Sequence, residues 1–455
     1  MLTQPPIPRL AGRPLLGNLL EFRENRLRLL TRLIPECGDA AEMRFGPVPV
    51  LALGSSELAE ALLVDHAGDF VKSRGLALAR VLVGDGMLTS ERDVHRRQRK
   101  LIAPGFRHAR IAGYADAMVE LAEEAHAGWR DGSVVNVAGE MMRLTLAIVA
   151  RTLFGARVDA EAEEIGEALT VALRWVVDAV SRPVNPPLWV PIRRNREMSR
   201  AIARLDETVY RLIRARRRSR EDRGDVLSML LAAQDEDDGT RMTDAQVRDE
   251  VMTLFLAGHE TTANALSWTW LLLAKHPEVY ARMREEVDSV LGGRPPAQSD
   301  LANLPFTLQV LKEAMRLYPP AYIVGRQAVR DVYLRGLRVP KGRIVLVNIY
   351  GIQRRAEYFP EPERFLPERF SPERERALPR FAYLPFGGGS RICIGNHFAL
   401  MEGHLVLAAL ARRVVFEVSH DDGNVEPEPL VTLRPKGGVW LRVRRRHGRR
   451  DALSA

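Results

Sequence analysis

One long apolar segment, residues 243–276, constrains the fold of this chain more than any other feature. Thr243 can cap a helix at its start, Gln246 completes a capping box three residues later, and Pro277 ends the helix. At 1.5 Å per residue, such a helix would be roughly 48 Å long. Its apolar side chains lie on every side, so we expect the helix to be buried along its length.

The middle of this segment breaks the pattern. Residues 257–262 read Ala-Gly-His-Glu-Thr-Thr. A glycine, a carboxylate and two threonines are each locally unfavourable in the centre of a buried helix. Violations of this kind usually mark a functional site.

The rest of the chain reads as mainly helical with a minor β portion. Helical periodicity and short β patterns are predicted over separate ranges. The helical ranges are 110–129, 140–154, 201–218 and 398–413, and the β ranges are 41–45, 48–53, 329–339 and 343–349, with a hairpin over 430–443. No linker divides the chain, so we expect one domain over residues 1–455, with flexible tails at 1–7 and 446–455.

Composition indicates a globular protein of a reducing compartment. Of the 455 residues, 46% are hydrophobic and 27% charged, and only two are cysteines, Cys37 and Cys393. The first 22 residues contain four prolines and no long apolar stretch, which argues against a signal peptide or a membrane anchor. We therefore expect a cytoplasmic protein.

Arginine-rich runs give the chain a net charge of +9. Such runs can meet nucleic acid, an anionic membrane or an acidic protein. No aromatic residues interleave with them, and no nucleic-acid motif accompanies them. Solvated helix faces are the simpler interpretation, and no nucleic-acid partner is expected.

The strongest chemical signal is the segment 386–395, Phe-Gly-Gly-Gly-Ser-Arg-Ile-Cys-Ile-Gly. Its three glycines let the backbone approach a flat object closely. Cys393 precedes the helix predicted near Phe398, and a helix N-terminus lowers the pKa of a thiol. A glycine-rich phosphate loop is the alternative, but its lysine is missing. Burial would be the default for a lone cysteine.

These residues resemble the haem-ligand loop of the cytochrome P-450 family. The matching positions are Phe386, Gly389, Arg391, Cys393 and Gly395. Three further motifs of that family follow the same order along the chain: residues 257–262, the Glu-x-x-Arg motif at 313–316, and the segment 365–370. The resemblance runs from about residue 8 to 443. It implies the cytochrome P-450 fold, in which the long buried helix crosses over the haem.

The resemblance implies a role for each motif. Cys393 would bind the iron of haem b as a thiolate, which favours O–O cleavage and leaves one position for dioxygen. On that far side Ala257 would leave room above the iron and contact the haem. Thr261 would hydrogen-bond dioxygen or an ordered water, and Glu260 would supply protons. His259 receives no role.

Further residues would hold the cofactor. Phe386, Gly387 and Gly395 would line the haem, and cations would bind its two propionates. The cations that the resemblance implies are His95, Arg99, Arg326 and Arg391. Glu313, Arg316 and Arg369 would form a buried ion network that fixes the Cys393 loop, although an ordinary surface ion pair is the alternative for Glu313 and Arg316.

A substrate pocket is implied above the haem. Its residues would be almost all apolar, which predicts a lipophilic small molecule such as a fatty acid, terpenoid or polyketide. Core packing is an equal alternative for any one of them. The residues are Leu76, Leu82, Leu88, Phe255, Ala257, Ile323, Val324, Leu430 and Val431.

Electrons would come from a separate ferredoxin or flavodoxin with its NAD(P)H-dependent reductase. Arg96, Arg97 and Lys100 would lie near Cys393 and attract such an acidic partner. The predicted activity is hydroxylation or epoxidation by a haem-thiolate monooxygenase. Alternatives are a haem-thiolate isomerase or dehydratase, a peroxide-driven enzyme, or a non-enzymatic haem sensor. The intact pair of Glu260 and Thr261 favours the use of dioxygen, because peroxide-using relatives lack it.

Overall fold

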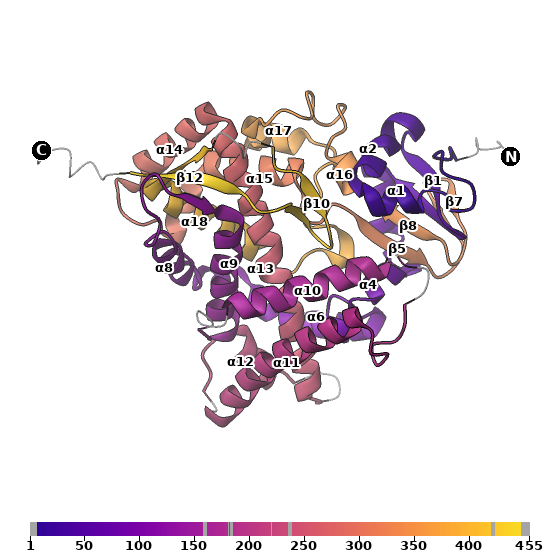
Figure 1. Cartoon of the computed structure of the whole chain (residues 1–455), viewed down its shortest axis with the longest axis horizontal. Coiled ribbons are helices and arrows are strands. Elements are labelled where there is room, and N and C mark those ends of the chain that lie inside the picture. Colours follow the sequence, from indigo (N-terminus) through magenta and orange to yellow (C-terminus); the bar gives the residue numbers. More distant parts are fainter. Residues whose placement is uncertain are drawn as a thin grey trace, which may run out of the picture.

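The computed structural model describes residues 7–157, 162–180, 182, 185–219, 221–234, 239–419 and 424–446. Helix α13, Asp244–Lys275, runs through the centre of the helical part (Figure 1). The Thr243 side chain accepts a hydrogen bond from the Gln246 backbone, and the capping box is complete. The helix ends at His276, before Pro277. The predicted long buried helix is therefore confirmed.

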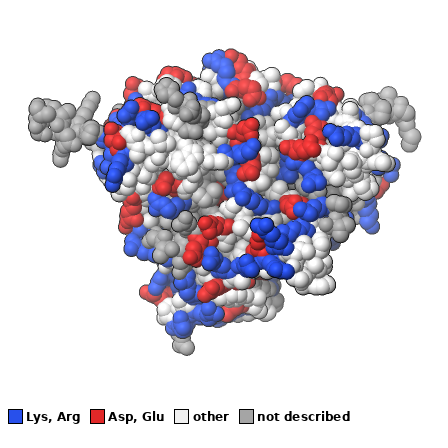
Figure 2. All heavy atoms as spheres, in the orientation of Figure 1, with Lys and Arg blue, Asp and Glu red and all other residues white. Residues whose placement is uncertain are grey.

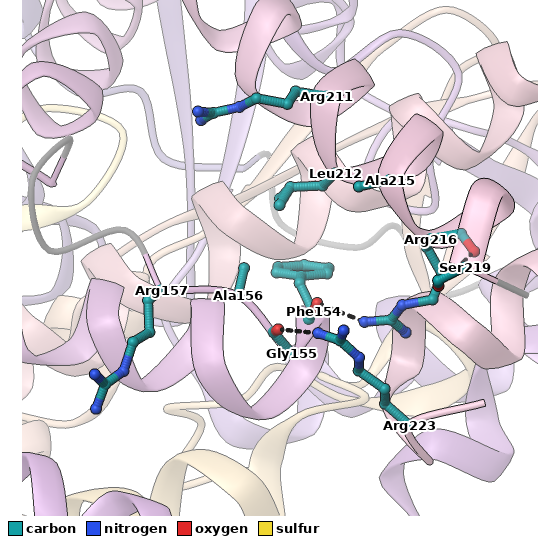
Figure 3. Close-up of a pocket in the computed structure, with 10 residues that line it drawn as sticks. All are labelled: Phe154, Gly155, Ala156, Arg157, Arg211, Leu212, Ala215, Arg216, Ser219 and Arg223. Atoms are coloured by element: carbon teal, nitrogen blue, oxygen red, sulfur yellow. Dashed lines mark hydrogen bonds between the residues drawn. The ribbon is translucent and has the colours of Figure 1, made fainter. Parts of the chain in front are cut away.

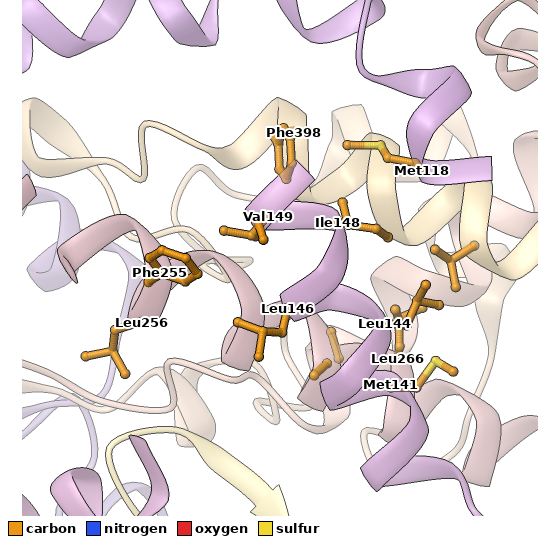
Figure 4. Packing of buried hydrophobic residues seen from close by; sticks show 14 of the residues in the cluster. Met118, Met141, Leu144, Leu146, Ile148, Val149, Phe255, Leu256, Leu266 and Phe398 are labelled. Carbon is orange, nitrogen blue, oxygen red and sulfur yellow. The ribbon is translucent and has the colours of Figure 1, made fainter. Parts of the chain in front are cut away.

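Among the helices that pack directly against α13 are α9 (Val137–Phe154), α11 (Arg193–Ser219), α15 (Pro305–Leu317) and α18 (Asn396–Arg413). Figure 4 shows the core where α8, α9, α13 and α18 meet, with Met118, Val149, Leu266 and Phe398 in one cluster. Because helices cover α13 on several sides, its apolar residues have no solvent-facing side. No helix among the described residues is both long and apolar enough to cross a membrane.

The other helices and helical turns complete this layer or connect it to the sheet. The longer ones are α2 (Arg26–Cys37), α6 (Arg92–Ile102), α8 (Ala115–Ala125), α10 (Ala162–Val180) and α14 (Pro277–Leu291). The shorter ones are α1 (Leu19–Glu24), α3 (Ser56–Glu60), α4 (Arg74–Ala77), α5 (Arg80–Val83), α7 (His108–Ala112), α12 (Val226–Ala232), α16 (Ile349–Ile352), α17 (Pro372–Ala377), η1 (Ala61–Asp65), η2 (Ala67–Asp69), η3 (Ala103–Phe106), η4 (Gln298–Asn303), η5 (Pro367–Phe370) and η6 (Gly389–Arg391).

The main sheet lies beside α1 and α2, toward the N-terminal side of Figure 1. Its strand order is β1-β2-β8-β5-β3, and only the β2–β8 pair is parallel. These strands are β1 (Ala40–Phe45), β2 (Val48–Leu53), β3 (Phe70–Lys72), β5 (Val324–Ala328) and β8 (Ile344–Val347). A three-stranded sheet of β4 (Val134–Asn136), β12 (Trp440–Arg445) and β9 (Val414–Val418) and two hairpins, β6 (Val332–Leu334) with β7 (Leu337–Val339) and β10 (Pro427–Pro429) with β11 (Leu433–Pro435), complete the β portion.

Three predicted ranges differ from the structure. The helix expected over 110–129 is divided into α7 and α8 near Gly113. The range 329–339 contains a turn between two short strands, and β5 ends before it. The hairpin expected over 430–443 is wrong, because Gly437 and Gly438 turn the chain at positive φ (76° and 93°) and send β12 to pair with β4 and β9.

The innermost residue of each expected tail is anchored to the rest of the fold. Ile7 packs against the core below the main sheet, and Arg446 forms an ion pair with Asp288 at 2.5 Å. The rest of the two tails, 1–6 and 447–455, lies outside the described residues.

Candidate functional site

The loop before Cys393 is pressed against η1. Gly389 has φ +66°, and a Cβ at this position would overlap the Leu63 carbonyl oxygen. A Cβ at Gly388 would overlap the Phe381 ring, whereas one at Gly387 would meet no atom within 4 Å. Two glycines are thus needed for close packing behind the loop, and the third leaves space beside it.

Cys393 faces an enclosed space. The backbone N–H of Cys393 donates to the Phe386 carbonyl oxygen at 3.0 Å, which closes the loop. The residue is exposed, yet burial raises the pKa of its thiol, against smaller lowering effects of the Gly395 backbone and the charge of Arg99. A side chain that is accessible but surrounded by protein indicates an internal space beside it.

The thiol pKa corrects one expectation from the sequence. A helix N-terminus was expected to make Cys393 a thiolate, but α18 begins only at Asn396 and the pKa is raised. Burial disfavours the charged form more than the nearby N–H dipoles favour it. A bound metal cation would supply the missing positive charge.

The middle of α13 has an accessible face, at Ala257 and Thr261. Ala257 is exposed and Thr261 half-buried, although Leu256, Glu260 and Thr262 next to them on this helix are buried. The Thr261 hydroxyl donates to the Ala257 carbonyl oxygen at 2.7 Å. Gly258 lies on the opposite side of the helix, where it allows close packing: a Cβ there would come within 3.0 Å of Val149 on α9. An exposed alanine in a buried helix requires an internal cavity beside it.

Cationic side chains crowd together near the Cys393 loop. Arg99 donates to the Ile392 carbonyl oxygen at 2.8 Å. Burial and then the charge of Arg391 lower the pKa of His95 to about 3 and that of Arg326 to about 10. The same two causes lower the pKa of Lys72 to about 7. The four predicted cations therefore lie together, and Lys72, which the sequence did not reveal, lies with them.

Among the described residues, Glu91 compensates part of this charge. Glu91 pairs with Arg391 and accepts a hydrogen bond from the Lys72 backbone at 2.7 Å. A dianion placed among these groups would offset their mutual repulsion. A haem with two propionates requires a thiol that faces a cavity, a helix face of small residues and a cluster of cations, and all three are present here. The residues present fit this cofactor.

The predicted ion network lies behind the loop. Arg316 and Glu313 form a bidentate pair at 2.7 and 2.8 Å, and both are fully buried. Arg369 approaches the same carboxylate at 3.3 Å. Gln353 donates to the Arg316 carbonyl oxygen at 3.0 Å and accepts from the Leu384 N–H at 2.9 Å. Through Gln353 the network reaches the segment that leads into the Cys393 loop.

The nine predicted pocket residues divide into two groups. Leu82 and Phe255 are packed in the core, and the Phe255 ring stacks on Phe154 with centroids 4.5 Å apart. We therefore do not assign Leu82 and Phe255 to the substrate pocket. The other seven are partly or fully exposed: Leu76, Leu88, Ala257, Ile323, Val324, Leu430 and Val431.

A different hollow of about 320 Å³ lies where α9 ends against α11. Figure 3 shows Arg216 and Arg223 there, donating to the carbonyl oxygens of Phe154 and Gly155. None of the predicted site residues lines it. On the face shown in Figure 2 the Lys and Arg side chains are interspersed with Asp and Glu.

Known proteins resemble this chain over nearly its whole length. Residues 5–442 match the family described as cytochrome P450. Cyclooctatin synthase of Streptomyces melanosporofaciens is 39% identical over 436 residues, which cover 94% of this chain and 92% of that protein. Pentalenene oxygenase of Streptomyces avermitilis is 34% identical over 438 residues, which cover 94% and 95%. The solved heme domain of cytochrome P450DA has a TM-score of 0.87 at 28% identity and covers 97% of this chain and 98% of that one.

These similarities confirm the fold class and the monooxygenase activity expected from the sequence motifs, together with a haem-thiolate cofactor. They extend over nearly the whole chain rather than one motif. The chain belongs to the cytochrome P450 family.

Proposed function

We propose that this monooxygenase hydroxylates a cyclic terpenoid, using haem b, dioxygen and two electrons from a separate protein. Relatives named for cyclooctatin and pentalenene support the terpenoid class. Leu76, Leu88 and Ile323, which we assign to the substrate pocket, are apolar and half-buried, and this suits a hydrocarbon-rich substrate. Cys37 and Cys393 are both free, which suits a cytoplasmic location.

One observation carries the proposal: an exposed Ala257 and a half-buried Thr261 interrupt a buried helix. When bound, the haem would supply the iron at which dioxygen is activated, with Cys393 as its thiolate ligand. Burial and the neighbouring cations lower the pKa of His95 to about 3, and a propionate beside the ring would oppose that shift. His95 would donate a hydrogen bond to a propionate, while Arg99, Arg326 and Arg391 would supply the charge.

Thr261 and Glu260 would manage protons on the substrate side. The Thr261 hydroxyl proton is directed to the Ala257 carbonyl oxygen, so its oxygen is available as an acceptor toward the cavity. It can hold a water molecule there and orient that water's protons. Burial raises the pKa of Glu260, which keeps a proton on this carboxyl more readily than on an exposed one.

The electron donor would be a ferredoxin or flavodoxin, supplied by an NAD(P)H-dependent reductase. Arg96 and Arg97 lie on α6, the helix that also carries His95 and Arg99. Arg96 is exposed and pairs with Asp93 at 2.8 Å. On docking, Arg96 would exchange the Asp93 carboxylate for a carboxylate of the electron donor. Charge reversal at both arginines should slow electron transfer and weaken its salt dependence. Unchanged rates and salt dependence would refute this docking surface.

The test of the proposed function has three stages. The reduced protein with carbon monoxide should show a thiolate-type absorption band, and the Cys393→His variant should lose it. Cyclic terpenoids should then shift the haem absorption of the ferric protein. Finally, turnover under ¹⁸O₂ should place one labelled atom in the product. An unlabelled, rearranged product would identify an isomerase or dehydratase instead, and product formed only with peroxide would refute the use of two electrons.

A further inference from the structure

Glu260 is held by a residue from the far end of the chain. Its Oε1 atom accepts a hydrogen bond from the Thr432 hydroxyl at 2.7 Å. The Asn264 side-chain amide, one turn further along α13, donates to the same hydroxyl at 3.1 Å. All three side chains are buried. Because the Asn264 amide occupies a lone pair of the hydroxyl, the Thr432 proton is directed to the Glu260 carboxylate.

A charged pair on the β10–β11 hairpin continues this contact toward solvent. The charge of Arg434 lowers the pKa of Glu260, after the larger raising effect of burial and the lowering effect of the Thr432 bond. Arg434 Nε and Nη2 are buried and have no hydrogen-bond partner within the described part of the chain. Nε lies 3.6 Å from a carboxylate oxygen of Glu428, which is 32% exposed. Arg434 therefore stands near both the buried and the surface carboxylate.

The turn that carries Thr432 also carries two proposed pocket residues, Leu430 and Val431. The Leu430 N–H donates to the Thr432 carbonyl oxygen at 3.0 Å, and the Leu430 carbonyl oxygen accepts from the Tyr322 hydroxyl at 2.7 Å. These bonds make the turn one tightly connected unit. Thr432 therefore directly follows, in one hydrogen-bonded turn, the two residues that a molecule in the proposed pocket would contact.

We propose that Thr432 is a positioning residue that holds Glu260 against the β10–β11 hairpin and couples occupancy of the substrate pocket to proton delivery. This inference rests on the proposed function, in which Glu260 supplies protons. In this structure the carboxyl is tied to the hairpin by the Thr432 hydroxyl. A substrate seated on Leu430 and Val431 loosens that tie, and the carboxyl can then turn toward the water beside Thr261.

The competing explanation is that Thr432 only fastens the hairpin to α13. Thr432→Val removes the hydroxyl and keeps the shape, and Thr432→Ser keeps the hydroxyl. Thr269→Val is a matched control, because this threonine lies on α13, is fully buried and donates only to the Ala265 carbonyl oxygen of its own helix. Thr432→Ala provides a second removal of the hydroxyl if the valine disturbs the fold.

The first readout needs no turnover. The carbonyl stretch of a protonated Glu260 is followed by infrared spectroscopy across pH in the ferric holoenzyme, and the band is assigned by its loss in Glu260→Gln. Removal of the hydroxyl should move ionisation to higher pH, since the Thr432 bond stabilises the charged form. Thr432→Ser and Thr269→Val should titrate like the unaltered protein. An unchanged titration in both Thr432→Val and Thr432→Ala would overturn the proposal.

The second readout uses turnover with a bound terpenoid. Thr432→Val should lower product formed per dioxygen consumed several-fold and change its pH profile, while ligand affinity stays unchanged. Unchanged coupling would refute the link to proton delivery even if the titration shifts. If the unaltered protein forms no oxygenated product but the titration shifts, the proposed function fails while the contact between Thr432 and Glu260 stands.

Discussion

Replacement of Arg316 by methionine should destabilise the protein strongly. Arg316 is fully buried and donates to both Glu313 carboxylate oxygens and to the carbonyl oxygens of Gln353, Pro362 and Arg364. Methionine fills similar space but provides no donor. The change leaves the buried Glu313 carboxylate with Arg369 at 3.3 Å and the Leu366 N–H at 3.0 Å.

The expected loss is about 3–5 kcal/mol, because breaking a buried ion pair from one side leaves an uncompensated charge. That is a large part of the ~5–15 kcal/mol that holds an ordinary domain together. The free energy of unfolding is measured by urea denaturation, followed by circular dichroism and by haem absorption in the same samples. We expect haem release at lower urea than the loss of helix, because the network supports the Cys393 loop through Gln353.

A matched control is Arg364→Met. Arg364 pairs with Glu361 at 2.6 Å, but both side chains are more than half exposed, and such pairs contribute little. The double change of Glu313 and Arg316 to methionine should be less destabilising than the sum of the single changes, since the Glu313 charge is removed together with that of its main partner. A loss below about 1 kcal/mol in Arg316→Met, or one equal to that of Arg364→Met, would refute the reasoning.

Three further predictions use the same structure. Thr261→Ala should uncouple dioxygen consumption from product formation, which is measured as product per dioxygen; undiminished coupling would contradict its role with water. Gly389→Ala should displace the loop and reduce haem retention, because the new Cβ overlaps the Leu63 carbonyl oxygen at φ +66°. Glu250 is fully buried, and burial raises its pKa from 4.5 to about 7, so the folded state keeps a proton that the unfolded state releases. The stabilisation that the protonated Glu250 carboxyl provides is lost as pH rises from 4.5 through about 7. Glu250→Gln should remove this pH dependence of stability and raise the free energy of unfolding by up to about 3 kcal/mol at pH 8.

The long helix could be predicted because its signals are local. Thr243, Gln246 and Pro277 lie at its ends, and the apolar pattern between them has no polar side. The C-terminal strands could not be predicted in the same way. The partners of β12 lie on β4 and β9, so no short-range pattern distinguishes this pairing from a hairpin with β11.

The candidate site shows the same division. Cys393 and the pair Glu313 and Arg316 lie in compact motifs, each readable within ten residues. Lys72 lies on β3 and joins the cation cluster only through the fold. Thr432 is 172 residues from Glu260 and carries no signal of its own. Leu82 and Phe255 have the right side chains for a pocket, but packing directs them into the core.

Cys393 shows why local rules describe the position of a reactive group better than its chemistry. A cysteine just before a helix is expected to ionise easily, and Cys393 does precede α18. Its surroundings reverse that expectation, because burial raises the thiol pKa more than Gly395 and Arg99 lower it. The thiol alone would stay protonated. Glu260 likewise keeps its proton more readily than an exposed carboxyl does, because burial raises its pKa. The fold thus places both groups for reactivity, and each needs a partner to stabilise its charged form. That partner is a metal cation for Cys393 and the Thr432 hydroxyl for Glu260.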